Sequence, residues 1–193
     1  MKRAAFASAC AALTTMLAHA APVTYQIEPT HTYPSFEADH MAGLSVWRGK
    51  FNKTAGTIVY DRATRESSIN ITVDTDSIDF GLDLMNSKAR SADFFDTAKY
   101  PTATYKGKLA GFDDKGMPST VDGELTMHGV TRPLQLQILK LKCMPHPMLK
   151  REICGADATA TFQRDAFGMD LGKAYGFNMD VTLRIQVEAL ANE

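Results

Sequence analysis

Apolar and polar residues alternate along most of this chain, which is the pattern of half-buried β-strands. The clearest stretch runs from Phe177 to Ala189, where every second residue is apolar and the residues between are polar or charged. A strand of that length suits a long, coiled barrel strand better than a flat sandwich. The same alternation predicts further strands at residues 25–27, 33–41, 44–53, 56–61, 69–73, 103–109, 121–127, 134–141 and 156–162.

One turn and one irregularity interrupt this pattern. Gly129 follows the alternating residues 121–127, and residues 128–133 end at a proline that can open the next strand. Gly129 therefore marks a turn that needs a special backbone dihedral. Farther along, the apolar phase moves from Ile138 to Leu139. We predict a β-bulge there, because one extra residue would shift the alternation in this way.

Residues 83–96 do not alternate, and their composition predicts one or two short helices before Tyr100 and Pro101. Many evenly spaced strands with few helices indicate an all-β sandwich or barrel. We favour an antiparallel β-barrel of about eight strands, with the helical segment covering one end. Closure removes exposed sheet edges, and a barrel of this size can hold one small ligand.

The first twenty residues have the pattern of a secretory signal peptide. A basic start, Met1-Lys2-Arg3, precedes a short apolar run that ends in Ala18-His19-Ala20, a small-residue cleavage site. We expect Cys10 to be removed with this segment rather than to serve as a lipoprotein site. Cleavage of 20 of the 193 residues would leave 173, enough for one domain over residues 21–193.

Charge and cysteine content narrow the class of protein further. Without the predicted signal peptide, 19 basic residues face 22 acidic ones, and no basic patch interleaved with aromatics suits nucleic acid. Two cysteines remain, Cys143 and Cys154, and an oxidising compartment makes a disulfide the default prediction. A redox-active pair is the alternative, but the Cys-x-x-Cys spacing that would support it is absent.

Four segments in order resemble the signature segments of the YceI-like family. The resemblance covers essentially the whole chain after the predicted signal peptide. It is carried by residues 25–28 (YQIE) with His31, Phe36, His40 and residues 49–51 (GKF), by residues 90–96 (RSADFFD) with Tyr100-Pro101, by residues 123–133 (GELTMHGVTRP) and by residues 164–168 (RDAFG).

This resemblance implies a lipocalin-like barrel secreted to the periplasm, with a long isoprenoid or other lipid-like chain inside it. Some members of the family are associated with stress responses and with isoprenoid quinones. One departure is visible, because Lys88-Ala89 stands where the family commonly has His-Leu. If that position touches a headgroup, the lysine would favour a more anionic one.

A lipid-binding tunnel needs an apolar lining, and each buried methylene contributes about 0.8 kcal/mol. Methionine suits such a lining because its thioether adapts to irregular ligands. Alternating alanines at positions 156, 158 and 160 leave volume unfilled, although ordinary core packing is the alternative for each apolar residue. A headgroup would meet His40, Lys88 and Arg90, unless Arg90 pairs with Asp93 or Asp96. The predicted ligand-binding residues are Phe36, His40, Met41, Phe51, Met85, Arg90, Phe94, Phe95, Ala158, Phe162, Phe167, Met169, Phe177 and Met179.

Other classes of function receive less support from the sequence. The histidines match no zinc or copper template, and no Gly-x-Ser-x-Gly nucleophile motif is present. We therefore expect a binding protein with no metal, no catalytic residues and no cofactor beyond its hydrophobic ligand. A quinone-linked redox or stress-response accessory protein, or an enzyme on a lipid-like substrate, is the main alternative. A homodimeric scaffold and transient membrane contact are also left open.

Overall fold

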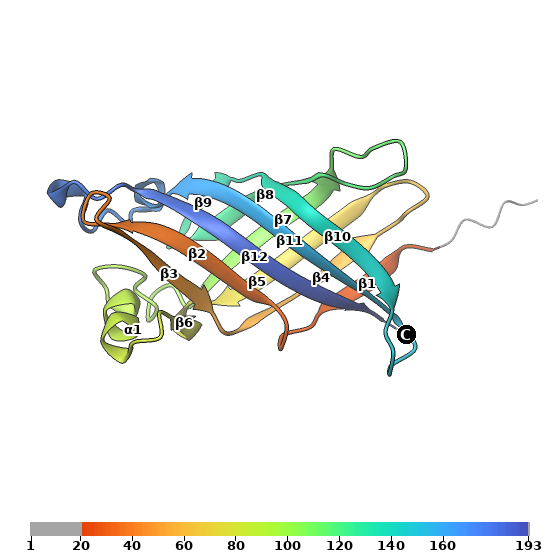
Figure 1. Ribbon diagram of the computed structural model, residues 1–193, viewed down its shortest axis with the longest axis horizontal. Helices are drawn as coiled ribbons and strands as arrows, with labels where there is room; N and C mark the ends of the chain where they lie inside the picture. The colour runs from red at the N-terminus through yellow and green to blue at the C-terminus, as the bar shows by residue number, and fades with distance from the viewer. Residues whose placement is uncertain (1–20, 193) are drawn as a thin grey trace, which may run out of the picture.

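The computed structural model describes residues 21–192, so the predicted signal peptide lies outside the described residues. Eight antiparallel strands form a closed barrel, because the last of them returns to pair with the first (Figure 1). The predicted all-β barrel of about eight strands is thereby confirmed. In order around the barrel, the strands are β1 (Val23–Ile27), β4 (Thr54–Tyr60), β5 (Ser67–Asp74), β7 (Thr102–Ala110), β8 (Thr120–Met127), β10 (Leu136–Pro145), β11 (Glu152–Gln163) and β12 (Asp180–Ala191).

A second group of strands extends the sheet beyond this ring. β2 (Tyr33–His40) pairs with β12 over Val181–Gln186, whereas β1 pairs with β12 farther along, over residues 189–191. β3 (Ser45–Phe51) and the short β6 (Ile78–Asp79) continue outward from β2. The α-helix α1 (Asp83–Arg90) lies beside β6, and β9 (Val130–Pro133) pairs with β8.

The remaining short elements are 3-10 helices in loops, η1 (Thr75–Ser77), η2 (Arg164–Phe167) and η3 (Lys173–Tyr175). The last strand begins at Asp180 rather than at Phe177, because η2, η3 and the left-handed Gly176 turn the chain before it. The helical segment is likewise shorter than residues 83–96: α1 ends at Arg90, since Ser91 is extended and caps it. No helix within residues 21–192 is long and apolar enough to cross a membrane.

Local features predicted from the pattern are present. His128 and Gly129 both have positive φ, 52° and 76°, and form a two-residue turn between the paired Met127 and Val130. This is the hairpin geometry that favours glycine at the second position. The register of β10 against β11 shifts between Ile138 and Lys140, where the bulge was predicted.

The predicted disulfide is also present, and it joins Cys143 to Cys154 across directly opposed positions of β10 and β11. The barrel therefore has two distinct ends (Figure 1). We call one the helix end, which carries α1, the β2–β3 turn and residues 164–179. The other we call the disulfide end, formed by the loops at residues 61–66, 111–119 and 146–151.

Candidate functional site

The interior of the barrel holds a cavity of about 1050 Å³, a volume at the upper limit of usual small-molecule sites. Side chains from all eight barrel strands line it, together with side chains from β2, β3 and α1. On β12 the lining residues run from Val181 to Ala189, which corresponds to roughly 26 Å along the strand at about 3.3 Å per residue. The cavity is therefore elongated and extends toward both ends of the barrel.

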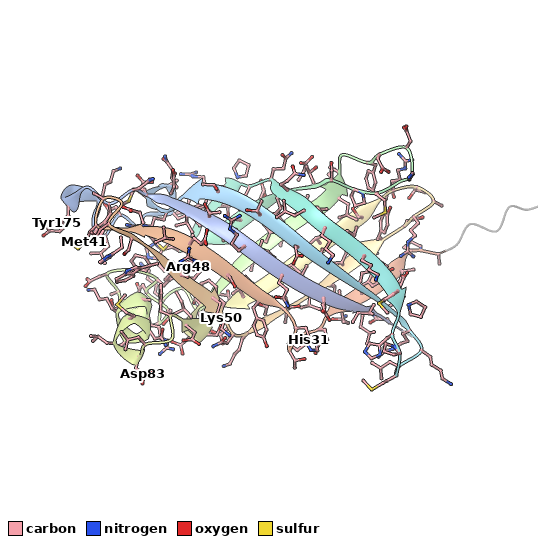
Figure 2. The ribbon with its side chains drawn as sticks, in the orientation of Figure 1. His31, Met41, Arg48, Lys50, Asp83 and Tyr175 are labelled. Carbon is pink, nitrogen blue, oxygen red and sulfur yellow. A yellow bond between two sulfur atoms is a disulfide. The ribbon has the colours of Figure 1, made fainter. Side chains whose placement is uncertain are left out.

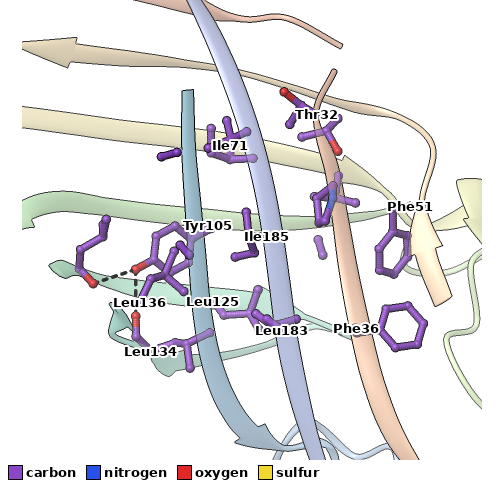
Figure 3. Close-up of a pocket in the computed structure, with 18 of the residues that line it drawn as sticks. Thr32, Phe36, Phe51, Ile71, Tyr105, Leu125, Leu134, Leu136, Leu183 and Ile185 are labelled. Atoms are coloured by element: carbon purple, nitrogen blue, oxygen red, sulfur yellow. Dashed lines mark hydrogen bonds between the residues drawn. The ribbon is translucent and has the colours of Figure 1, made fainter. Parts of the chain in front are cut away.

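The middle of the cavity is formed by branched aliphatic side chains, among them Ile71, Leu125 and Ile185 (Figure 3). Tyr105 also lies here, but its hydroxyl donates to the carbonyl of Leu134 at 2.8 Å. Burial, with a further effect of the Asp122 charge, raises the pKa of Tyr105, so the phenol stays neutral. Tyr105 thus bonds to the wall through its polar atom and leaves its ring as apolar surface.

Aromatic rings gather at the helix end of the cavity. Phe36 lies 5.8 Å from Phe51 and 5.4 Å from Phe80, measured between ring centroids, and Phe51 lies 5.7 Å from Phe95. Gly49 on β3 makes room for Phe36, since a Cβ at Gly49 would come within 2.6 Å of that ring. These edge-to-face and tilted contacts stabilise an apolar wall beyond what burial alone provides.

His40 completes this wall through stacking rather than through a free imidazole. Its ring stacks on Trp47 at 4.1 Å and lies 5.6 Å from Phe177. His40 and Trp47 lie on the neighbouring strands β2 and β3. Their pairing places a polarisable surface at the helix end of the cavity.

A buried arginine holds the loop at the helix end. Arg164 is 6% exposed, and its guanidinium donates to the carbonyls of Met169 at 2.8 Å and Leu171 at 2.7 Å. The same group lies 5.5 Å from the ring centroid of Phe94, within range of a cation–π contact. Burial lowers the pKa of Arg164 from its ordinary value. Since both carbonyls belong to the loop that follows η2, Arg164 positions that part of the cavity wall.

Polar and charged side chains line the disulfide end. The Tyr25 hydroxyl donates to the Oε2 oxygen of Glu152 at 2.5 Å. Arg62 donates to the Tyr25 hydroxyl at 2.9 Å and to the same Glu152 oxygen at 2.8 Å. Burial and the hydrogen bond to Glu152 raise the pKa of Tyr25 to about 12. Burial would raise the pKa of Glu152 as well, but hydrogen bonds from Tyr25 and Arg62 hold it below its ordinary value. Lys115 and Lys142 also line this end.

The structure brings most of the predicted ligand-binding residues together around the cavity, and their contact with a ligand stays a prediction. Lys88, the predicted headgroup contact, also lines the cavity and forms an ion pair with Asp93 at 2.6 Å. Ten of the predicted residues line the cavity: Phe36, His40, Phe51, Met85, Phe94, Phe95, Ala158, Phe162, Met169 and Phe177.

Four other predicted residues lie outside the cavity lining. Met41 is 56% exposed because it occupies the turn after β2 with a φ of 51°, and its side chain lies at the helix end (Figure 2). Phe167 and Met179 are buried in the protein core around η2 and before β12. The guanidinium of Arg90 donates to the carbonyl of Asp76 at 2.8 Å and also pairs with the Asp76 carboxylate.

Arg90 thus forms a structural ion pair, which was the alternative prediction, but its partner is Asp76 rather than Asp93 or Asp96.

Several residues that line the cavity were not predicted from the sequence. Trp47 shares the alternating phase of Gly49 and Phe51, so that phase could have revealed it. Arg62 and Glu152 are 90 positions apart and follow no motif, and only the closed barrel brings them together.

Comparison with known proteins agrees with this architecture. Residues 25–189 match the model of the YceI-like domain. The chain belongs to the YceI-like family. This confirms the family resemblance in the sequence, and the match reaches all eight strands of the barrel.

Individual relatives cover different shares of the chain. A UPF0312 protein of Shewanella baltica is 34% identical over 90% of this chain and 92% of its own length. A UPF0312 protein of Vibrio cholerae is 39% identical, but the alignment spans 61% of each protein. A solved structure from Saccharophagus degradans, described as a polyisoprenoid-binding domain, has a TM-score of 0.60 at 18% identity. The alignment covers 87% of this chain and 98% of that structure, which shows a shared fold.

Proposed function

We propose that this protein binds a long hydrophobic molecule, a polyisoprenoid or an isoprenoid quinone, inside its barrel and carries or sequesters it in the periplasm. The single observation that carries the proposal is the elongated apolar cavity of about 1050 Å³. Protein interiors are ordinarily close-packed, so an apolar space of this size within a folded barrel suits a ligand rather than side-chain packing.

The energetics favour a long hydrocarbon tail in this cavity. Each methylene moved from water to apolar surroundings contributes about 0.8 kcal/mol. A tail along the middle of the barrel would contact aliphatic side chains, and Tyr105 presents no free hydroxyl there because its donor is taken by Leu134. Such a site would bind through the length of the tail and would need few polar contacts.

Two further observations support the ligand class and the location. The similar Saccharophagus degradans structure is described as a polyisoprenoid-binding domain. The first twenty residues have the composition of a cleavable secretory signal. Mass spectrometry of the protein from its own host would test the second point, because cleavage at the predicted site would give a chain that begins at Ala21.

A binding role is favoured over the alternative of a redox accessory protein or an enzyme. Tyr105 and Arg164, two polar residues of the cavity wall, are hydrogen-bonded to backbone carbonyls. Catalysis on a lipid-like substrate would need a reactive group facing the apolar stretch of the cavity. Within residues 21–192, the Tyr25, Arg62 and Glu152 cluster lies at the disulfide end instead.

Native mass spectrometry of the protein, purified from its host under mild conditions, tests the proposal. We expect an added mass that corresponds to an isoprenoid or a related lipid. After removal of that lipid, the protein should take up a purified polyprenol and gain thermal stability, because a ligand that binds only the folded state raises the midpoint of unfolding. A protein that retains no lipid and takes none up would overturn the proposal.

A further inference from the structure

The charged residues that line the cavity are distributed unequally between its two ends. At the helix end, the charged groups already have partners within the protein. Lys88 pairs with Asp93 at 2.6 Å, and the Asp39 carboxylate accepts hydrogen bonds from the backbone of Gly43 and Asn178. The Arg164 guanidinium is bound to backbone carbonyls. These groups therefore offer little to a charged ligand.

The residues that line the cavity at the disulfide end have an excess of positive charge. Three cations, Arg62, Lys115 and Lys142, line this part of the cavity, and a single carboxylate, Glu152, accompanies them. Glu152 pairs with Arg62. Neither lysine forms an ion pair with a carboxylate within residues 21–192. These four lining residues thus carry a net excess of two positive charges.

Arg62 is suited to a further contact. Both of its hydrogen bonds, to Tyr25 and to Glu152, come from one terminal nitrogen, Nη2. Its Nη1 and Nε make no hydrogen bond to the described part of the chain, and the side chain is 49% exposed. Each of these free donors can bind one oxygen of a carboxylate or phosphate.

The apolar wall of the cavity begins directly beside these charged side chains. Tyr25 belongs to a buried cluster with Ile27 and Ala189, against which Ile58 and Val187 pack. The disulfide fixes the neighbouring strands, and the side-chain atoms of Cys143, Cys154 and Glu152 lie within 4.8 Å of one another. A cationic group of side chains at the end of an apolar tube is complementary to a molecule with an anionic head and a hydrocarbon tail.

We propose that the disulfide end is the headgroup site, that it takes an anionic carboxylate or phosphate group, and that the tail of the ligand points toward the helix end. This inference rests on the proposed function, since it assumes that a hydrophobic tail occupies the cavity. It reverses the orientation expected from the sequence, in which His40, Lys88 and Arg90 were the headgroup residues. Arg62 and Lys115 are the residues that recognise the charge.

Tail-matched pairs of ligands test the proposal. Oleate is compared with oleyl alcohol, and geranylgeranyl phosphate with geranylgeraniol, by calorimetry on the delipidated protein at low salt. We expect the anionic member of at least one pair to bind about tenfold more tightly than its alcohol, which corresponds to about 1.4 kcal/mol. A preference within the first pair identifies a carboxylate headgroup, and one within the second identifies a phosphate.

Amino-acid substitutions then identify which side chains bind the anionic headgroup. Lys115→Gln alone, and Arg62→Gln with Lys115→Gln, should reduce the preference to threefold or less while binding of the alcohols is retained. Retained alcohol binding shows that the barrel is folded. The matched control, Arg132→Gln with Lys140→Gln, removes two cations whose side chains are exposed and do not line the cavity, and it should keep the preference.

Two outcomes would overturn the headgroup site. Equal binding of both members of each pair by the unmodified protein would refute it and leave the proposed function standing. Loss of the preference in Lys88→Gln, with the preference kept in the Arg62 and Lys115 variant, would place the headgroup at the helix end. Failure to bind any of the four ligands would instead count against the proposed function.

Discussion

At single positions on the inner face of the barrel, the size of the side chain determines how much space is left for a ligand. Ala158 is 7% exposed, lies on β11 opposite Ile138, and lines the cavity. A larger residue at that position would occupy the space that we assign to the ligand. The neighbouring Asp157 is exposed and lies on the outer face of the same strand, since successive strand residues point to opposite faces.

We expect Ala158→Trp to weaken binding of a polyprenol by at least about tenfold, or about 1.4 kcal/mol, because the indole obstructs the cavity. Binding is measured by native mass spectrometry and by calorimetry, and the far-ultraviolet circular dichroism should stay that of the parent. Asp157→Trp adds the same ring outside the barrel and should bind normally. Unchanged binding by a folded Ala158→Trp would show that this position does not border the ligand.

The raised pKa of a single tyrosine gives the protein a pH-dependent stability. The ordinary pKa of Tyr25, 10.0, applies to the unfolded chain, and in the folded protein the value is about 12. The folded state therefore holds the phenol proton more tightly. The resulting stabilisation is complete below pH 10 and is lost as the pH rises through about 12.

We predict that the free energy of unfolding, from urea titrations between about pH 9 and about pH 11, falls less steeply for Tyr25→Phe than for the parent. Some decline should remain, because the pKa of Tyr105 is also raised by burial. Tyr175→Phe, a change at a side chain that is 83% exposed, serves as the control and should not alter the slope. An identical slope in Tyr25→Phe would contradict the assigned pKa.

At the level of the hairpins, backbone geometry determines whether a glycine can be replaced by a larger residue. In the β8–β9 turn, Gly129 has a φ of 76°, and a Cβ there would lie 2.8 Å from the ring of Tyr100. Gly155 on β11 has no such restriction, since a Cβ would meet its nearest neighbour at 3.7 Å. The fold therefore requires a glycine at position 129 but not at position 155.

Gly129→Ala should destabilise the protein by about 1–3 kcal/mol, because a non-glycine residue in the left-handed region is strained and the methyl group also meets Tyr100. Gly155→Ala should change the stability by less than about 1 kcal/mol. Urea unfolding at neutral pH measures both. Equal effects of the two substitutions would argue against the strained turn.

The β10–β11 hairpin carries the second element-level prediction. The disulfide between Cys143 and Cys154 closes a short loop, since the two cysteines have a sequence separation of 11. A cross-link of this length restricts the unfolded chain by about 3 kcal/mol. Cys143→Ala with Cys154→Ala should lose about that much stability in urea unfolding. Reduction of the parent with dithiothreitol should have a similar effect, and no loss in either case would mean that the hairpin is held by the strands alone.

At the level of the whole molecule, the length of the cavity predicts how affinity depends on the ligand. The lining spans roughly 26 Å along β12, at about 3.3 Å per residue. In a series of straight-chain alcohols, we expect each added methylene to strengthen binding by up to about 0.8 kcal/mol until the cavity is full. Beyond that length the affinity should level off. Calorimetry gives the series, and affinity without dependence on chain length would be inconsistent with a tail inside the barrel.

Local sequence determined much of this fold. Alternation with a period of two identified the long strands, because successive side chains of a strand must point to opposite faces. Gly129, the phase shift at Ile138 and the two late cysteines correctly indicated a turn, a bulge and a disulfide. Each of these depends on backbone sterics or on residues close together along the chain.

Only the tertiary structure decided which side chains share the cavity. Alternation gives the face of a residue relative to its neighbours, but not the register that joins β1 to β12 across about 160 positions. That closure places Arg62 against Glu152, which no local pattern could indicate. The same physical limit explains Met41: it continues the strand pattern in sequence, but the chain turns there and exposes it to solvent.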